Sequence, residues 1–308
     1  MIRLDSRLPV PQSLRGAIVA LGNFDGFHLG HQAVVGEALR WARAEGRLAI
    51  VATFSPHPVE FFAAGSPPFR LSTLDQRQEW FAAAGADAML VFHFDAAMAA
   101  TSAQDWVHEV LGRQIGAAGV VTGEDFTFGK ARQGTVDVLA TLGADMGMAA
   151  RTVGPVTQAG EIVSSSRVRA SLRAGDPITA ARLLTRPFTI RATVQHGDKL
   201  GRTIGFPTAN LALGDYLRPA YGIYAVTGRL PDGRTVAGAA NLGIRPHFDP
   251  PKELLEPHFF DFSGDLYGQD IDIAFHAFLR GEAKFESMDA LVAQIGRDCD
   301  AARRVLAV

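Results

Sequence analysis

The chain has 308 residues, 47% of them hydrophobic, which suits about two ordinary domains of ~100–200 residues each. Its formal net charge of −2 argues against the basic surface that binds nucleic acids, although small anionic ligands need only local cations. The single cysteine, Cys299, excludes an internal disulfide, and no apolar run is long enough for a signal peptide or a bilayer span. We therefore expect a soluble cytoplasmic protein without nucleic-acid or membrane partners, and the sequence leaves its oligomeric state open.

The first half of the chain alternates short β-branched runs with longer segments of helical periodicity. This order predicts a parallel sheet with right-handed crossovers and helices on both faces, an α/β Rossmann-like fold. In such sheets, ligands bind beyond the carboxyl ends of the strands. The predicted strands are 17–21, 48–54, 88–92, 119–123 and 148–154, and the predicted helices are 31–44, 74–84 and 102–115.

The pattern changes near Arg186. Just before that point, Asp176 and Pro177 predict the N-cap and first position of a helix. Beyond it, β-rich segments are separated by turn signals, and the sequence PDG predicts a hairpin within 223–243. An amphipathic helix is expected over 287–306. We infer a second, mainly antiparallel barrel domain with a C-terminal helix, and place the domains at 1–185 and 186–308.

The stretch GNFDGFHLGHQ, residues 22–32, follows the first of these strands and opens the first helix. It matches neither the dinucleotide fingerprint nor the P-loop, although its glycines suit a tight turn that a phosphate can approach. His28 and His31, three residues apart at a helix start, can together neutralise charge on a phosphate. The alternative is that one histidine caps a turn and the other is an ordinary surface residue. The residues of this loop that we expect to contact a phosphate-bearing ligand are Gly22, Asn23, Phe24, Asp25 and Gly30.

The same stretch resembles the HxGH motif of the nucleotidylyltransferase superfamily, in the form found in bacterial bifunctional riboflavin kinase/FAD synthetases. The resemblance covers nearly the whole chain and keeps the order of the motifs. It implies an FMN adenylyltransferase domain followed by a riboflavin kinase domain, with riboflavin, FMN and ATP as substrates, FAD as the final product and Mg²⁺ as cofactor. The other stretches that carry it are TFSPHP (53–58), GEDFTFG (123–129), SSSRVR (164–169), GRTIGFPTANL (201–211) and LLEPHFFDFSGDLYG (254–268).

For adenylyl transfer, the resemblance places His28 and His31 at the α-phosphate of ATP and Arg169 on phosphates, a task that suits a planar bidentate donor. Asp125 is expected to contact adenosine or flavin, although an Asx-turn is an equally open interpretation. His57, between two prolines, is consistent with no more than a stiff turn. Hydroxyl donors are expected from Ser164, Ser165 and Ser166, where the family usually has Thr at the last position; a simple serine cap is the alternative.

For the kinase reaction, Thr208 and Asn210 lie two residues apart, so in an extended segment their side chains share a face. A hydroxyl and an amide oxygen suit Mg²⁺ bound to ATP phosphates, although an edge-strand turn would also explain the pattern. The resemblance implies that Glu256 is the base that takes the proton of the ribityl hydroxyl. Gly201 and Gly205 are expected in the ATP- or flavin-binding loop.

Two residues near the kinase motifs depart from the family pattern. His247 stands where Thr is usual, and Pro257 follows Glu256 and removes a backbone donor from the expected strand. Two other functions stay open at this point. The chain could be an FMN adenylyltransferase with a non-catalytic flavin-binding barrel, or a flavin-storage protein with degenerate sites.

Overall fold

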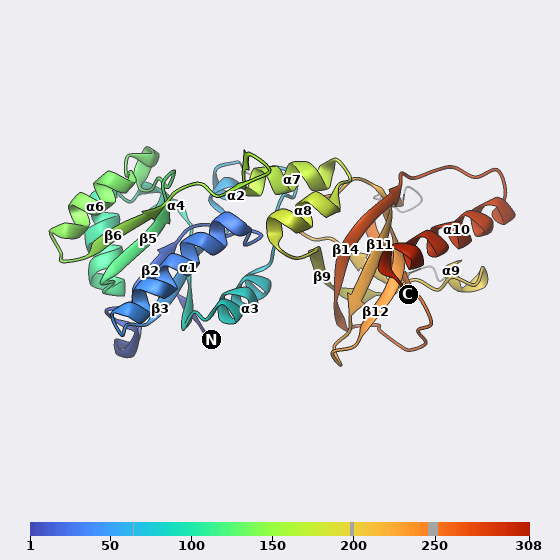
Figure 1. The fold of residues 1–308 in the computed structure, drawn as a ribbon, viewed down its shortest axis with the longest axis horizontal. Coiled ribbons are helices and arrows are strands. Elements are labelled where there is room, and N and C mark those ends of the chain that lie inside the picture. The colour runs from blue at the N-terminus through green and yellow to red at the C-terminus, as the bar shows by residue number, and fades with distance from the viewer. Residues whose placement is uncertain (64, 198–199, 246–251) are drawn as a thin grey trace. The chain divides into compact units, whose positions relative to one another are not determined.

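The structure is a computed structural model that describes residues 1–63, 65–197, 200–245 and 252–308. His247 lies outside these residues. The described chain forms two compact units (Figure 1). Unit 1 comprises Met1–Ser66 and Leu74–Val163, and unit 2 comprises Pro67–Thr73 and Ser164–Val308.

Unit 1 contains a six-stranded sheet in the order β1-β4-β3-β2-β5-β6, with every neighbouring pair parallel. The predicted parallel α/β fold is therefore confirmed. The first strand was not predicted; it pairs with β4 at the sheet edge. The strands are β1 (Ile2–Asp5), β2 (Ile18–Leu21), β3 (Ala49–Ser55), β4 (Ala88–His93), β5 (Gly119–Gly123) and β6 (Ala149–Val153).

Helices cover both faces of this sheet because its strands carry apolar side chains on both sides. α1 (Leu29–Ala44) and α3 (Leu74–Ala84) contribute to one core, and η2 (Trp106–Ile115) and α6 (Val136–Ala144) to the other. The helix predicted over 102–115 is present, but η2 is a π-helix. The shorter elements are η1 (Gln12–Leu14), α2 (Pro58–Phe62), α4 (Ala96–Ala100), α5 (Ala103–Asp105), η3 (Lys130–Arg132), β7 (Thr157–Gln158) and β8 (Glu161–Ile162).

Unit 2 is built on a closed barrel in the order β10-β13-β12-β11-β14-β9, and all its strand pairs are antiparallel. The predicted barrel, its hairpin and its C-terminal helix are confirmed. The strands are β9 (Phe188–Gln195), β10 (Asn210–Ala212), β11 (Gly222–Arg229), β12 (Thr235–Arg245), β13 (Lys252–Phe259) and β14 (Asp270–Arg280). The helices are α7 (Ser165–Arg173), α8 (Pro177–Leu184), α9 (Leu200–Thr203) and α10 (Met288–Leu306).

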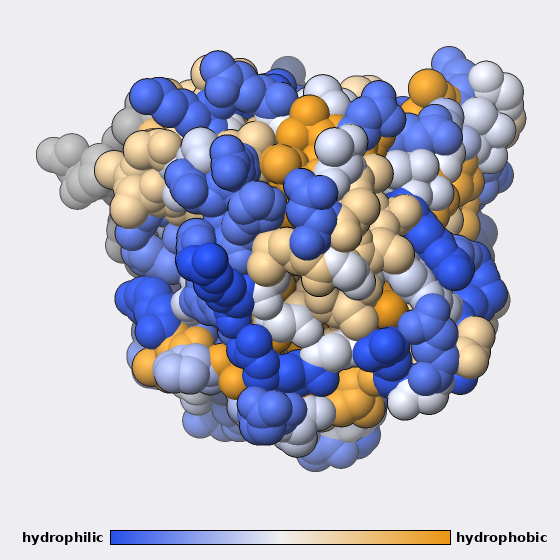
Figure 2. Space-filling view, turned by 90° about the vertical axis from the view of Figure 1, so that its left-hand side faces the viewer, coloured by the Kyte–Doolittle hydropathy of each residue, from blue (hydrophilic) through white to orange (hydrophobic). Residues whose placement is uncertain are grey.

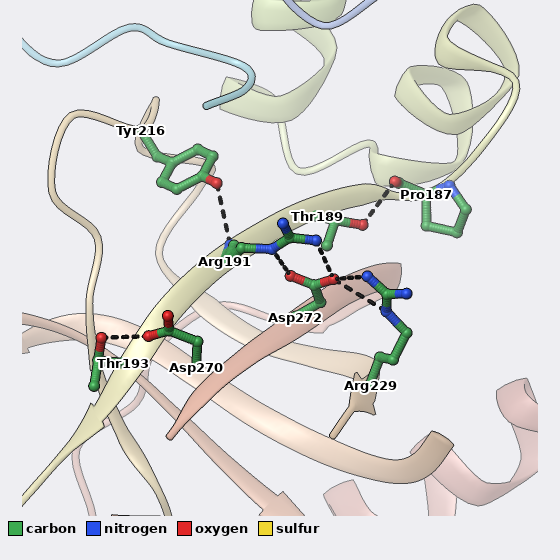
Figure 3. Close-up of polar contacts among 8 residues, drawn as sticks. All are labelled: Pro187, Thr189, Arg191, Thr193, Tyr216, Arg229, Asp270 and Asp272. Atoms are coloured by element: carbon green, nitrogen blue, oxygen red, sulfur yellow. Dashed lines mark hydrogen bonds and ion pairs between the residues drawn. The ribbon is translucent and has the colours of Figure 1, made fainter. Parts of the chain in front are cut away.

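The barrel strands β9, β14 and β11 are joined by a carboxylate that binds two guanidinium groups (Figure 3). Asp272 accepts hydrogen bonds of 2.6 and 2.9 Å from Arg191 and of 2.8 Å from Arg229. Burial opposes ionisation, but the hydrogen bonds from Arg191 and Arg229 outweigh it and hold the pKa of Asp272 below its ordinary value. The three charges therefore stabilise the register of three neighbouring strands.

The segment Pro67–Thr73 belongs to unit 2 although the residues on both sides of it belong to unit 1. The Arg70 N–H donates to the Asp215 carbonyl at 3.1 Å, and the Leu217 N–H donates to the Arg70 carbonyl at 2.8 Å. These bonds form a parallel bridge between Arg70 and Tyr216. The chain thus passes between the two units at residues 66–67, 73–74 and 163–164.

In the described ranges, no helix is both long and apolar enough to cross a membrane. Figure 2 views the molecule from the side on which α6 lies, and there the strongly hydrophobic residues occur in small groups separated by hydrophilic ones. Such scattered exposure is ordinary for a protein surface.

Candidate functional site

The loop between β2 and α1 lies at the carboxyl end of a central strand of the parallel sheet. Its backbone has positive φ at Phe24 (49°), Gly26 (81°) and Phe27 (45°). Positive φ at a bulky residue costs free energy and persists only where the surroundings enforce it. At Gly22, a Cβ atom would lie 3.1 Å from the Phe24 ring, which explains the glycine there. The loop is therefore a tightly folded, strained turn.

His28 and His31 lie side by side at the first turn of α1. His28 is the N-cap, its Nδ1 accepts the His31 N–H at 3.4 Å, and the two rings stack with centroids 3.6 Å apart. At Gly30, a Cβ atom would lie 3.1 Å from the His28 ring and 3.4 Å from the Val163 carbonyl oxygen. Two imidazoles are thus held together where the helix N-terminus favours an anion.

Asp125 lies in an exposed turn directly after β5, the strand next to β2. The turn is closed by a hydrogen bond of 3.1 Å from the Phe126 N–H to the Gly123 carbonyl. The sheet therefore brings Asp125 to the same edge as the histidine loop. Asp25, within that loop, is only 2% exposed.

His57 has a local structural role, at the start of a helix and not in the stiff turn that the sequence suggested. It is the N-cap of α2, where its Nδ1 accepts the Val59 N–H at 3.2 Å. Its own N–H donates to Glu60 at 3.1 Å, which completes a capping box. The side chain therefore stabilises a short helix.

The SSSRVR segment opens α7 in unit 2, whereas the two histidines belong to unit 1. Ser164 is the N-cap and accepts the Arg167 N–H at 3.2 Å, so the capping interpretation is confirmed for this serine. Ser165 and Ser166 form the first turn of α7. Arg169 donates to the Phe69 carbonyl at 2.9 Å, and its guanidinium lies over the Phe69 ring. The Pro67–Thr73 segment thus orients this arginine.

In the barrel, three polar side chains line up across neighbouring strands. β10 and β13 pair antiparallel, and the register of Leu211 with Leu255 places Asn210 opposite Glu256. On the other side of β13, Asn241 of β12 is the register partner of Glu256, and its Nδ2 lies 3.4 Å from a Glu256 carboxylate oxygen. Residues directly opposite each other share a face of the sheet, so the carboxylate has an amide on each side.

Close contacts or backbone conformation explain why the two predicted loop positions, Gly201 and Gly205, are glycines. At Gly201, a Cβ atom would lie 2.2 Å from the Phe206 carbonyl oxygen and 3.5 Å from the Thr208 hydroxyl. Gly205 has φ of +86°, which disfavours other residues. At Gly197, a Cβ atom would lie 2.4 Å from the Asn210 amide nitrogen. The loop around Thr208 and Asn210 therefore packs against bare backbone.

Pro257 fits within β13 for a local reason. Its carbonyl accepts the Ala209 N–H at 3.0 Å, so its backbone polar edge points toward the irregular segment that precedes β10. The missing N–H thus falls on that side and not in the ladder with β12. The strand therefore tolerates the missing backbone donor of Pro257.

Each half of the chain matches a known protein family. The family model described as FAD synthetase matches residues 10–167, and the one described as riboflavin kinase matches residues 184–306. The bifunctional riboflavin kinase/FMN adenylyltransferase of Escherichia coli K12 is 36% identical, with 92% of this chain and 90% of the relative covered. The chain belongs to this family.

Other family members are equally similar, and a solved structure shares the fold. The bifunctional riboflavin kinase/FMN adenylyltransferase of Pseudomonas fluorescens is 38% identical, with 95% of this chain and 94% of the relative covered. A crystal structure described as that of a macrolide-efflux protein from Streptococcus pneumoniae has a TM-score of 0.88 and 28% identity. That similarity covers 98% of this chain and 99% of the other.

Three residues that the sequence analysis did not identify contact the predicted sites. Arg77 of α3 and Thr53 of β3 hold the Asn23 carbonyl of the histidine loop, and Asn241 contacts Glu256. One signal was available for Arg77. It lies three residues after Leu74 and four before Phe81, which places a cation on the apolar face of a helix. The others depend on strand register, which the sequence leaves open.

Proposed function

We propose that the chain catalyses both reactions of its family. Unit 2 phosphorylates riboflavin to FMN with ATP. The FMN is then adenylylated with a second ATP to give FAD and pyrophosphate, and the histidine loop of unit 1 is at the centre of this second reaction. The paired imidazoles at the N-terminus of α1 carry the proposal for adenylyl transfer. The amide–carboxylate–amide row on the barrel carries it for the kinase.

In the adenylyl transfer, an FMN phosphate oxygen forms a bond to the α-phosphorus of ATP while the bond to pyrophosphate breaks. Both reactants are anions, so positioning and cationic screening supply most of the rate enhancement. His28 and His31 would donate hydrogen bonds to the α-phosphate as negative charge builds on it. Arg169 would bind phosphate through its guanidinium, with Ser165 and Ser166 as hydroxyl donors and Asp125 toward adenosine or flavin.

In the kinase reaction, the ribityl hydroxyl attacks the γ-phosphorus of ATP, ADP leaves, and the hydroxyl proton is transferred to the Glu256 carboxylate. The amide of Asn241 fixes the orientation of that carboxylate. Glu256 would therefore act as a general base whose geometry is set by β12 and β13.

Mg²⁺ would be held mainly by the ATP phosphates. Among the residues that the structure describes, no three His, Cys, Asp or Glu side chains gather as a cation-binding group. The hydroxyl of Thr208 and the amide oxygen of Asn210 are hard neutral oxygens, which suit an ion that retains several waters. Bound there, Mg²⁺ would neutralise phosphate charge during the transfer.

The decisive experiment incubates the purified protein with riboflavin, ATP and Mg²⁺ and separates FMN from FAD over time. We expect FMN to appear first and FAD to follow. An adenylyltransferase with a non-catalytic barrel would convert supplied FMN to FAD but form nothing from riboflavin. Omission of Mg²⁺ should abolish product formation.

A further inference from the structure

One face of α3 supports the histidine loop at several points. Phe81 is fully buried and packs edge-on against the rings of Phe24 and Phe27, at centroid distances of 5.8 and 5.1 Å. Those two residues are the ones with strained positive φ. Arg77 precedes Phe81 by four residues and so lies on the same face of the helix. The strained turn is therefore held from α3.

Arg77 is only 3% exposed, and it contacts the backbone of the loop directly. Its Nη1 donates to the Asn23 carbonyl at 3.0 Å and to the Thr53 hydroxyl at 2.9 Å. The Thr53 hydroxyl in turn donates to the same carbonyl at 2.7 Å. The Asn23 carbonyl thus accepts two hydrogen bonds from rigid elements, α3 and β3.

This fixed carbonyl determines where the next N–H points. In a trans peptide, the carbonyl of Asn23 and the N–H of Phe24 point in opposite directions. Because Arg77 and Thr53 hold the carbonyl, the Phe24 N–H is directed away from them. Loops that bind phosphates do so through backbone N–H groups held in one orientation. A buried guanidinium close behind the loop also adds positive potential where an anion would bind.

We propose that Arg77 is a positioning residue for adenylyl transfer: it fixes the Asn23–Phe24 peptide, and with it the strained turn that leads to His28, in the orientation that meets the phosphate. The proposal rests on the proposed function of unit 1. It assigns Arg77 no contact with the reacting atoms. Its effect on the rate comes from the geometry and charge of the loop.

Three variants of the full-length protein test this role. Arg77→Met keeps an unbranched apolar side chain but removes the charge and the hydrogen bonds. Arg77→Lys keeps the charge, and Thr53→Val removes only the bridging hydroxyl. The matched control is Arg113→Met, because the exposed Arg113 side chain pairs with Glu109 on its own helix, away from the histidine loop in the sequence. Steady-state rates are measured for FAD formation from FMN and FMN formation from riboflavin, with near-UV circular dichroism and thermal unfolding of each protein.

We expect Arg77→Met to lower kcat for adenylylation by about 10²-fold, since small displacements of positioning groups cost that much. Arg77→Lys should recover part of the rate, Thr53→Val should lose less, and the Arg77→Met/Thr53→Val double variant should be no slower than Arg77→Met. The kinase rate and the Arg113→Met enzyme should match wild type. If Arg77→Met does not fold, a normal adenylylation rate in folded Thr53→Val and Arg77→Lys overturns the proposal.

A folded Arg77→Met enzyme with wild-type kcat would also overturn it, as would an equal fall in both reactions. These results are separate from a failure of the proposed function. In that case the wild-type protein itself would not form FAD, or His28→Ala would leave FAD formation intact.

Discussion

Asn241 and Glu256 face each other across β12 and β13, with the amide nitrogen of one 3.4 Å from a carboxylate oxygen of the other. Asn210 lies opposite Glu256 on the other neighbouring strand. A carboxylate that is oriented by a fixed amide cannot rotate freely, so its basic oxygen points in one direction. This arrangement allows the base and its support to be tested separately.

Glu256→Gln keeps the size of the side chain and one acceptor oxygen but removes the basic carboxylate. We expect FMN formation from riboflavin to fall ~10²–10⁴-fold, the usual cost of losing a general base. Adenylylation of supplied FMN should stay near wild type. Pro257→Val, next in the chain, should alter the kinase rate only modestly. If Glu256→Gln formed FMN at the wild-type rate with saturating ATP and Mg²⁺, the base would have to lie elsewhere.

Asn241→Leu removes the amide that contacts Glu256 and keeps a side chain of similar volume. We expect the kinase kcat to fall about tenfold, since a hydrogen bond to a charged group is worth roughly 1.5 kcal/mol. In the Glu256→Gln background, the same change should have a smaller effect because the charged acceptor is gone. Additive losses in this double-mutant cycle would contradict a role through Glu256. FAD formation from FMN serves as the internal control.

His28→Ala and His31→Ala test the other site. Each should suppress FAD formation from FMN by ~10²–10³-fold, because a donor to developing phosphate charge is lost. FMN formation from riboflavin should persist, since both histidines belong to unit 1. Product separation over time distinguishes the two rates. An equal loss of both activities in a folded variant would reject the assignment.

The kinase domain can be produced as a separate fragment with either of two start points. α8 contacts the barrel strands β9 and β14, and Leu183 and Leu184 of that helix are buried. A fragment that begins at Ser164 keeps this cover, whereas one that begins at Arg186 exposes the apolar surface beneath it. We expect both fragments to phosphorylate riboflavin, with a lower unfolding temperature for the shorter one. A folded but inert longer fragment would show that unit 1 supplies kinase residues.

Asp272→Asn tests the charge cluster of the barrel. We expect the free energy of unfolding at pH 7 to fall by about 2–3 kcal/mol, because two guanidinium groups lose their carboxylate. The pKa of Asp272 lies below its ordinary 3.8, so its contribution is present above that pH and is lost as the pH falls through the lowered pKa. The difference between wild type and variant should therefore shrink in acid.

Urea titrations at pH 7 and below pH 4 would measure this difference. The control is Asp232→Asn, which removes an exposed ion pair in the β11–β12 hairpin and should change little. A difference between Asp272→Asn and wild type that stayed constant down to pH 3 would show that the carboxylate charge is not the cause.

The sequence predicted the elements whose signals are local. The strands of the six-stranded sheet other than β1 were predicted from short β-branched or apolar runs. The Asp176–Pro177 pair marked the start of α8, and Ser287 proved to be the N-cap of α10. β1 was missed because its four residues, IRLD, alternate over too short a run to indicate a strand, and they gain a partner only when β4 lies beside them. Its pairing is a tertiary effect that no local pattern encodes.

The candidate sites divide in the same way. Two histidines three residues apart at the start of a helix could be recognised from the sequence alone, and in the structure their rings stack. The contacts that hold the site, from Arg77 to the Asn23 carbonyl and from Asn241 to Glu256, join residues 54 and 15 positions apart. They depend on strand register and on the rotation of α3, which sequence periodicity does not determine.

The bridge between Arg70 and Tyr216 also affects how the protein is made. Arg70 leaves the ribosome long before Asp215, since 215 − 70 = 145 residues separate the two partners of its backbone hydrogen bond. At synthesis rates of ~5–20 residues per second, Arg70 waits roughly 7–30 s before Asp215 emerges. During that interval Phe69 and Leu71 are exposed on the nascent chain. Slow translation of the barrel would therefore lengthen the period in which a chaperone, or another nascent copy, can bind this segment.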